Sequence, residues 1–265
     1  MEGNMKLTKE FLKDIMSIPS CSGHESMMRD YILDFAADRG IRSTVDRKGN
    51  VYLVKGELGP GEYYPCLVNH MDTVHFDEAV LADRGMRLEI LEETAGDGNT
   101  VLRARGTGIG ADDKLGCAIA LAILDGREKC KAAFFVEEEL GTLGSKEMDT
   151  SWFADVSFVL SFDSPGRNRS SRSCYGRDLY SREFFERYLR GVCAANGVTA
   201  FNREPFTDVV NIRDRTDLMC FNVGNGGYNA HRPDEYLVVE HAEAACKLGN
   251  DLFDAIGMDF GMRIR

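Results

Sequence analysis

The chain has 265 residues, of which 43% are hydrophobic and 28% are charged, and its formal net charge is −11. A chain of this size can bury a full core, and its excess of acidic residues disfavours nucleic acid and anionic membranes as partners. The apolar runs are shorter than the roughly 20 residues that cross a bilayer, and the opening stretch MEGNMKLTKEFLKDIM is typical of an amphipathic helix. We therefore expect a cytoplasmic protein, and its negative charge favours cations or substrates with a free amine.

Helical and strand patterns alternate along the chain. Apolar residues three and four apart predict helices, and β-rich or continuous apolar runs predict strands. In chain order we expect helices over 7–17 and 25–38, a hairpin over 41–56, a buried strand over 64–70, a hairpin over 87–104, a helix over 114–124, buried strands over 131–138 and 156–163, a helix over 181–196, a strand over 218–224 and a helix over 239–253.

This order of elements predicts an α/β fold. Continuous apolar strands are typical of a sheet that is covered on both faces. The sequence shows no internal repeat and no clear linker. We therefore predict one domain over residues 1–265 with three layers, in which a doubly wound mixed sheet carries helices on both faces.

Polar side chains gather where the predicted buried strands end. His70 ends one strand, the acidic run 137–139 follows a second, Asp163 ends a third, and His231 comes after a fourth. In open α/β sheets, ligands bind beyond the carboxyl ends of the strands. Asp112, in the stretch GTGIGADDKLG, lies at the start of a predicted helix. Such a group of histidines and carboxylates suits zinc, cobalt or manganese.

His70 and Asp72 form a His-x-Asp pattern in VNHMDTVHFD. A lone histidine is more often a hydrogen-bonded or surface residue than a metal ligand. Residues two apart on a strand share a face, so Asp72 can accept the second ring N–H of His70 and orient the ring. His24, His75 and His241 lack this pattern, and we interpret them as surface or supporting residues.

Two other motifs have competing interpretations. The acidic run VEEEL is typical of a solvated surface, but here it follows an apolar strand, where its carboxylates would repel one another without cations. The glycines of RGTGIGADDKLG favour a phosphate loop only weakly, because their spacing is not G-x-G-x-x-G. The sequence contains no G-x-S-x-G elbow and no cysteine beside a histidine, which argues against a covalent nucleophile.

Six stretches taken together resemble a known superfamily. They are IPSCSGHE, NHMDTV, GIGADDKLG, EEELG, SFD and NAHRPDEYLVVE. Their order and approximate spacing resemble those of the co-catalytic zinc exopeptidases, which include peptidase T, aminoacylase and single-domain zinc aminopeptidases. The resemblance covers nearly the whole chain and implies a metal-dependent exopeptidase.

The resemblance also implies a site for two divalent metal ions, with zinc expected first and cobalt or manganese as alternatives. His70 and Asp163 would hold one ion, Glu139 and His231 would hold the other, and Asp112 would bridge both. Two such ions share a water molecule and lower its pKa.

The remaining catalytic groups are implied in the same way. Asp72 would orient His70, and Glu138 would be the general base that relays a proton to the leaving amine. The extra carboxylate of Glu137 leaves this register open by one residue. We expect Glu137, if uncommitted, to pair with the ammonium group of a substrate.

The segment between Asp163 and His231 departs from the pattern of peptidase T and aminoacylase, which carry an inserted lid domain there. Here it is predicted to hold one helix, one or two strands and the loop SPGRNRSSRSCYGRD, so the lid would be absent. Single-domain relatives are typically aminopeptidases. We therefore expect an aminopeptidase for small peptides or amino-acid derivatives, either a monomer or an oligomer that does not depend on a lid.

Substrate contacts are predicted from two segments. Arg167 and Arg169 could clamp a carboxylate, because guanidinium pairs with it bidentately, and Tyr228 lies in a segment that could cover the metals. The arginine loop could equally be solvated and flexible. An N-acyl amino acid amidohydrolase, a dipeptidase or a carboxypeptidase of the same superfamily remains an alternative function, and a non-catalytic metal-binding relative is a less favoured one.

Overall fold

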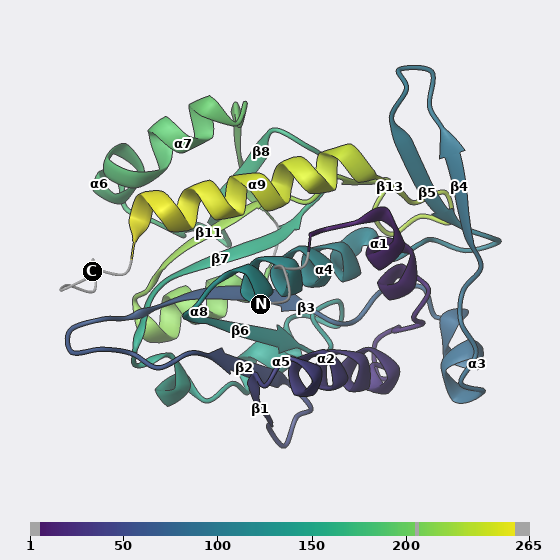
Figure 1. The fold of residues 1–265 in the computed structure, drawn as a ribbon, viewed down its shortest axis with the longest axis horizontal. Coiled ribbons are helices and arrows are strands. Elements are labelled where there is room, and N and C mark those ends of the chain that lie inside the picture. The colour runs from purple at the N-terminus through teal and green to yellow at the C-terminus, as the bar shows by residue number, and fades with distance from the viewer. Residues whose placement is uncertain (1–5, 205–206, 258–265) are drawn as a thin grey trace.

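The structure is a computed structural model that describes residues 6–204 and 207–257, and a large mixed sheet forms its centre (Figure 1). The strands of this main sheet are β1 (Arg42–Val45), β2 (Val51–Lys55), β3 (Tyr64–His70), β6 (Cys130–Phe135), β7 (Val156–Ser164), β8 (Arg169–Cys174), β9 (Arg177–Asp178), β10 (Ala200–Glu204) and β11 (Met219–Gly224). Their order is β1-β2-β6-β3-β7-β11-β8-β10, and β9 pairs with β8.

The centre of the sheet is parallel and its edges are mixed. Strands β6, β3, β7 and β11 run parallel, whereas β1, β2 and β6 are joined in antiparallel pairs. Every residue of β3, β6 and β11 is buried. Burial on both faces explains why these strands are continuous apolar runs, as the sequence predicted.

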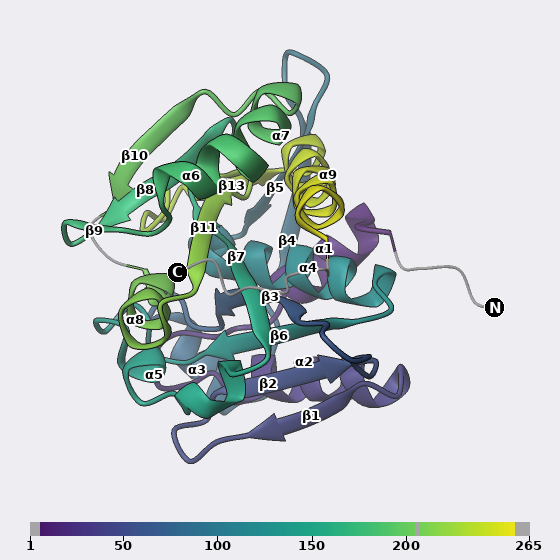
Figure 2. The ribbon, with the colours of Figure 1, turned by 90° about the vertical axis from the view of Figure 1, so that its left-hand side faces the viewer.

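Helices cover both faces of the sheet. They are α1 (Lys9–Met16), α2 (Ser26–Asp38), α3 (Glu78–Asp83), α4 (Ala111–Gly126), α5 (Leu143–Lys146), η1 (Thr150–Phe153), α6 (Arg182–Phe184), η2 (Phe185–Leu189), α7 (Arg190–Ala195), α8 (Asp208–Thr216) and α9 (Val239–Ile256). Helices α1, α2, α4 and α9 lie on one face, and α5 and α8 lie on the other (Figure 2). The predicted three-layer α/β fold is thus confirmed.

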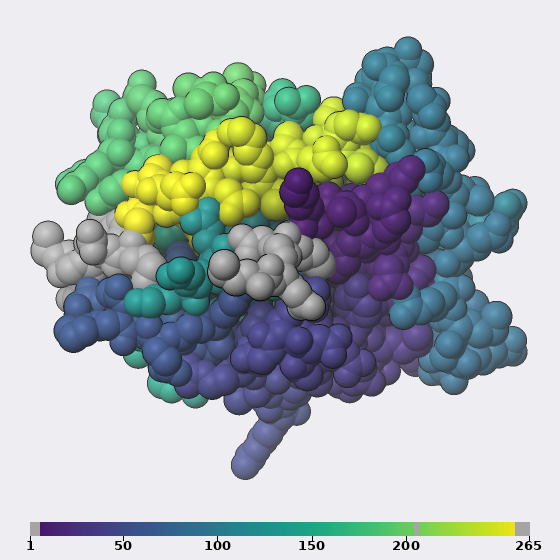
Figure 3. Space-filling model, in the orientation of Figure 1, coloured from purple at the N-terminus to yellow at the C-terminus, as the bar shows by residue number. Residues whose placement is uncertain are grey.

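The apolar face of α9 explains its position in the front layer. Its buried residues recur three and four apart, from Val239 and Ala242 to Leu252 and Ile256, so one side of the helix packs against the core. Figure 3 shows α9 (yellow) lying across this face, between the region of α6 and α7 (green) and the N-terminal helices (purple).

A second, smaller sheet was not predicted. It consists of β4 (Ile90–Thr94), β5 (Thr100–Ala104), β12 (Gly227–Tyr228) and β13 (Tyr236–Val238), in the order β12-β13-β5-β4. The expected hairpin over residues 87–104 is present as β4 and β5, and it projects at one end of the molecule (Figure 1). Strands β12 and β13 are only two and three residues long, too short for their sequence pattern to be recognised.

The arginine-rich segment after Asp163 is a strand of the main sheet, which corrects the alternative of a solvated, flexible loop. Strand β8 pairs with β11 and β10. Ser170 and Ser171 are fully buried there, and the hydroxyl of Ser171 lies 3.0 Å from that of Ser164 on β7. Because small polar residues replace the usual apolar ones, the hydrophobic pattern of the sequence does not indicate this strand. Strand β10 and helix α8 were also missed.

None of the helices within residues 6–204 and 207–257 has the length and apolar character needed to cross a membrane.

Candidate metal centre

The carboxyl ends of the central strands meet at one edge of the main sheet. His70 is the last residue of β3, Asp163 lies near the end of β7, and the acidic run 137–139 follows β6. His70 pairs in register with Phe135, the last residue of β6. Parallel strands therefore bring these side chains to the same place, as predicted from the sequence.

Asp112 lies between two histidines at this edge. Its Oδ1 atom is 3.2 Å from Nε2 of His70, and its Oδ2 atom is 3.2 Å from Nε2 of His231. The Nε2 atom of His70 is also 3.4 Å from Oδ1 of Asp163, and that of His231 is 2.8 Å from Oε1 of Glu139. The structure thus forms three groups of possible metal ligands within the described residues. Two of them share Asp112, and the third consists of His70, Glu138 and Glu139.

The electrostatics of this cluster fit divalent cations. The Nε2 atom of His70 is buried and has no hydrogen-bond partner among the described residues. Burial alone would lower the pKa of His70, but Glu138, Asp112 and Asp163 together raise it well above its ordinary value. Carboxylates gathered this closely need compensating positive charge. Imidazole nitrogen and carboxylate oxygen are the ligands that zinc, cobalt and manganese accept.

The individual carboxyl groups respond differently to their surroundings. Burial raises the pKa of Glu138, Glu139 and Asp163 above the usual range. Burial would raise the pKa of Asp112 too, but the contacts of its carboxylate with the imidazoles of His231 and His70 hold that pKa below its ordinary value. The contacts of His231 with the carboxylates of Asp112 and Glu139 raise the pKa of His231 to about 10. Without cations, the histidines are therefore the only positive partners within the described cluster.

Asp72 connects His70 to the acidic run. The Nδ1 atom of His70 lies 3.0 Å from the backbone oxygen of Asp72 and 3.4 Å from the carboxylate of Asp72. The closer contact is therefore with the backbone carbonyl and not, as predicted, with the carboxylate. The carboxylate instead accepts the backbone N–H groups of Glu138 and Glu139 at 2.9 and 3.1 Å and the hydroxyl of Ser22 at 2.7 Å. Asp72 thus holds both the histidine and the acidic run in place.

The acidic run separates into one outward and two inward carboxylates. Glu137 has a backbone φ of 50° and forms an ion pair with Lys48. It is therefore committed, which corrects the expectation that it is free to pair with a substrate ammonium. Glu138 is buried, with Oε2 4.0 Å from Nε2 of His70, and Glu139 contacts His231. The structure thus places Glu138 and Glu139, and not Glu137, at the cluster.

Several buried polar residues at the site were missed by sequence reasoning. Asp113 accepts hydrogen bonds from the Asn69 amide at 2.6 Å and from the backbone N–H of His70 at 3.3 Å. Thr207 donates to Oδ2 of Asp163 at 2.6 Å. Beside it, both carboxylate oxygens of Asp208 are buried without a hydrogen-bond partner among the described residues, and burial raises the pKa of this carboxyl to about 8. The pair Asp112-Asp113 was a usable signal for Asp113, whereas Thr207 and Asp208 stand in a segment with no predicted element.

The three predicted substrate contacts lie apart from the cluster. Arg167, Arg169 and Tyr228 line a hollow of about 520 Å³ together with His241, and none of the candidate ligands is among its lining residues within the described chain. The hydroxyl of Tyr228 lies 2.7 Å from Nδ1 of His241. The structure therefore does not bring these residues to the candidate metal ligands.

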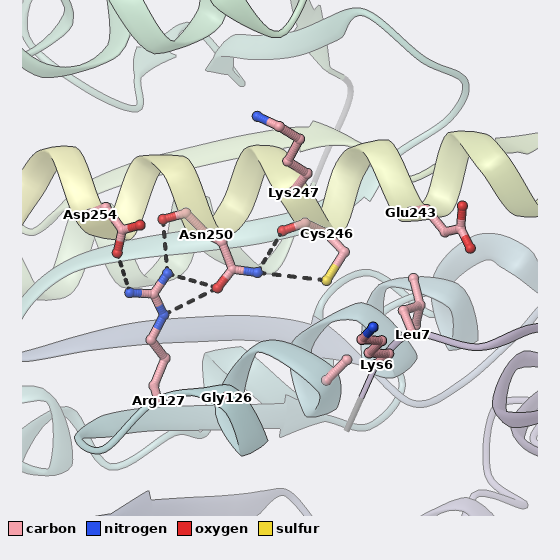
Figure 4. Close-up of a pocket in the computed structure, with 10 residues that line it drawn as sticks. Lys6, Leu7, Gly126, Arg127, Glu243, Cys246, Lys247, Asn250 and Asp254 are labelled. Atoms are coloured by element: carbon pink, nitrogen blue, oxygen red, sulfur yellow. Dashed lines mark hydrogen bonds and ion pairs between the residues drawn. The ribbon is translucent and has the colours of Figure 1, made fainter. Parts of the chain in front are cut away.

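A larger groove of about 590 Å³ lies between α4 and α9 (Figure 4) and is also separate from the cluster. Arg127 reaches across it, and its guanidinium contacts the side chains of Asn250 and Asp254 (Figure 4). These polar groups are satisfied by one another, so the groove is explained by the packing of α9 on α4.

The fold and the arrangement of possible ligands are similar to those of metal-dependent exopeptidases. Residues 57–231 match peptidase family M28, and the chain belongs to this family. Family members are metal-dependent, typically with zinc. The predicted membership of the zinc exopeptidase superfamily is therefore confirmed.

Individual relatives agree with this assignment. The chain is 37% identical over 75 residues to a LysW-lysine hydrolase of Deinococcus radiodurans and 27% identical over 169 residues to the cytosol non-specific dipeptidase of Escherichia coli. These matches cover 28% and 61% of this chain, and 20% and 34% of the two relatives. A tripeptidase from Staphylococcus aureus shares the fold, with a TM-score of 0.71, 98% of each chain covered and 12% identity.

Proposed function

We propose that the protein hydrolyses peptide bonds with two divalent metal ions, zinc first and cobalt or manganese as alternatives. The position of Asp112 carries this proposal, because it presents one carboxylate oxygen to His70 and the other to His231. His70 and Asp163 would hold one ion, Glu139 and His231 the other, and Asp112 would bridge them. Five ligands exceed what one tetrahedral zinc ion requires.

The chain supplies a general base next to these ligands. When bound, the two ions polarise the scissile carbonyl and lower the pKa of the attacking water. Glu138 accepts the proton of that water and delivers it to the leaving amine. Its backbone N–H is fixed by the carboxylate of Asp72, and its side chain is buried close to His70. Asp72 thus orients both a ligand and the base.

We assign the substrate as a small peptide with a free amino end, which makes the enzyme an aminopeptidase. The site has more carboxylates than positive groups, since Asp113 and Asp208 are buried beside the five candidate ligands. An excess of negative charge favours a substrate that brings an ammonium group. The family assignment supports a peptide substrate.

We also propose that the chain works as one cytoplasmic domain without a lid. Between Asp163 and His231 the described residues form β8, β9, β10 and β11 of the main sheet, β12 of the small sheet, and helices α6 to α8. Helix α8 packs on β11, and α7 packs on α9. This arrangement supports a monomer, or an oligomer whose contacts do not involve a lid.

A second candidate is a dipeptidase or an N-acyl amino acid amidohydrolase with the same metal chemistry. The likeness to the dipeptidase of Escherichia coli favours it, because that match covers 61% of this chain. The amidohydrolase differs from the aminopeptidase because its substrate carries no free amine, whereas a dipeptide carries one.

The test is a substrate panel with protein reconstituted with Zn²⁺, Co²⁺ or Mn²⁺. We expect close to two metal equivalents per chain and hydrolysis of amino-acid amides and short peptides with free amines. Faster cleavage of N-acyl amino acids would favour the amidohydrolase. A fully folded protein that binds no metal would contradict both candidates.

A further inference from the structure

A second group of buried charged residues packs behind the start of α4. It consists of His75, Glu78, Lys114 and Glu235, which we call the supporting cluster. Lys114 is fully buried, donates to the backbone oxygen of Ile18 at 2.8 Å and lies 3.8 Å from Oε1 of Glu78. None of these residues belongs to the proposed ligand set, so their burial needs another explanation.

Glu235 connects this cluster to the candidate bridging ligand. It is 1% exposed, and both of its carboxylate oxygens are in use. Oε2 lies 2.7 Å from Nε2 of His75 and accepts the backbone N–H of Gly110 at 2.7 Å. Oε1 accepts the backbone N–H of Asp112 at 3.1 Å. One carboxylate therefore holds the backbone of the residue whose side chain faces both histidines.

Glu235 is also tied to the second histidine of the site. The backbone N–H of Glu235 donates to the carbonyl of Arg232 at 3.0 Å, and that of Arg232 donates to Asn229 at 3.2 Å. His231 stands inside these consecutive turns, with a backbone φ of 66°. The carboxylate of Glu235 thus sets the distance between the segment of His231 and the start of α4.

The glycine-rich loop before Asp112 packs directly against His75. A Cβ atom on Gly108 would lie 2.0 Å from Cε1 of His75 and 2.8 Å from the carbonyl of Arg232. A side chain at this position would push the imidazole away from Glu235. The glycine therefore permits close approach of the loop to His75, which accounts for it without a bound phosphate.

We propose that Glu235, anchored by His75, is a positioning residue that holds Asp112 between the two metal ions. This inference rests on the proposed two-metal function. Groups that orient metal ligands typically change metal affinity or activity by about 10- to 100-fold when they are removed. Here the orientation passes through the backbone N–H of Asp112, so the effect on metal binding is separable from catalysis by Glu138.

The test is Glu235→Gln with Co²⁺ as the probe. Glutamine keeps the size of the side chain, but its NH₂ group is a donor, so the backbone N–H of either Asp112 or Gly110 loses its acceptor. We expect Co²⁺ titration to show about 10- to 100-fold weaker binding and a changed visible absorption spectrum. The matched control is Glu240→Gln, because Glu240 also accepts a backbone N–H, that of Thr100, at 2.9 and 3.0 Å. The control should keep the Co²⁺ affinity and the spectrum.

A second pair of variants tests the anchor without altering Glu235. His75→Gln retains an N–H group that can donate to Glu235, whereas His75→Ala does not. We expect His75→Ala to reproduce the weaker Co²⁺ binding and His75→Gln to restore part of it. Gly108→Ala should act in the same direction as His75→Ala, because its methyl group displaces the imidazole.

The inference would be overturned if the Glu235→Gln variant had a lower unfolding temperature but an unchanged Co²⁺ affinity and spectrum. That result would show that Glu235 has a purely structural role. Equal Co²⁺ binding by His75→Ala and His75→Gln, both at the wild-type level, would also overturn it. Wild-type protein that binds Co²⁺ but cleaves no peptide would instead overturn the proposed function, and Co²⁺ affinity would still decide the role of Glu235.

Discussion

Two buried charged regions lie side by side at the start of α4, and they differ in how their carboxylates are neutralised. In the supporting cluster, Glu235 contacts His75 and Glu78 faces Lys114. In the metal cluster, six carboxylates share the two histidines His70 and His231, and they are those of Asp112, Asp113, Glu138, Glu139, Asp163 and Asp208. The residue types are nearly the same in both. What distinguishes a site for an external cation is therefore the excess of buried carboxylates over positive groups of the chain.

The largest effect is expected within the metal cluster, from Glu138→Gln. The amide has almost the same shape but cannot accept a proton, and such groups contribute roughly 10²- to 10⁴-fold to the rate. We expect kcat to fall by that amount with metal content unchanged. Glu139→Gln should instead lower the metal content, measured by elemental analysis. Exchanged phenotypes would show that the two roles are assigned the wrong way round.

Substitutions in the supporting cluster should change the free energy of unfolding rather than the catalytic rate. Lys114→Met leaves Glu78 buried without its cation, and breaking a buried pair costs about 3–5 kcal/mol. We expect a loss of this size in urea unfolding of the metal-free protein. The double variant Lys114→Met with Glu78→Leu should recover part of it, because the uncompensated charge is removed. A loss below about 1 kcal/mol in the single variant would show that the pair is not needed for charge balance.

Substrate choice tests whether the excess negative charge of the metal cluster attracts an ammonium group. Blocking the substrate amine removes this attraction and leaves a carboxylate unpaired, at a cost of a few kcal/mol. We expect kcat/KM to be at least about tenfold higher for a free-amine peptide than for its N-acetylated form, which corresponds to roughly 1.4 kcal/mol. A preference for the acetylated peptide would contradict the aminopeptidase assignment.

The smallest effect is expected from Glu137→Gln, although this residue adjoins the general base. Glu137 faces Lys48, and both side chains are partly exposed. Such pairs contribute less than about 1 kcal/mol to stability. We expect kcat to change by less than about twofold, in contrast to Glu138→Gln. A large loss of activity would mean that Glu137 faces the substrate during turnover.

The candidate site could be predicted from the sequence because its ligands follow strong strands. His70, Asp163 and Glu139 stand at or just after the ends of buried parallel strands, and this position alone brings them to one edge. Glu235 could not be recognised in this way. It acts through backbone N–H groups of residues more than a hundred positions away, and such contacts depend on the folded chain.

The fold was predictable where hydrophobic patterns are clear. Strand β3 was predicted with its observed bounds, and the front helices were found with small shifts at their ends. Strand β8 was missed because buried serines, held by a hydroxyl contact to β7, replace apolar residues there. Helix α8 was missed because its polar residues dominate the stretch DVVNIRDRT, although Val209 and Ile212 are buried.

His231 reaches the metal cluster from the small sheet, whereas the other histidine reaches it from the main sheet. It lies in the turn between β12 and β13 of the small sheet, whereas His70 and Asp163 lie on the main sheet. Its side chain is 47% exposed, compared with 1% for His70. An ion between His231 and Glu139 would therefore cross-link the two sheets from the solvent side. We expect that ion to exchange first, and its departure to loosen the small sheet while the inner position stays filled.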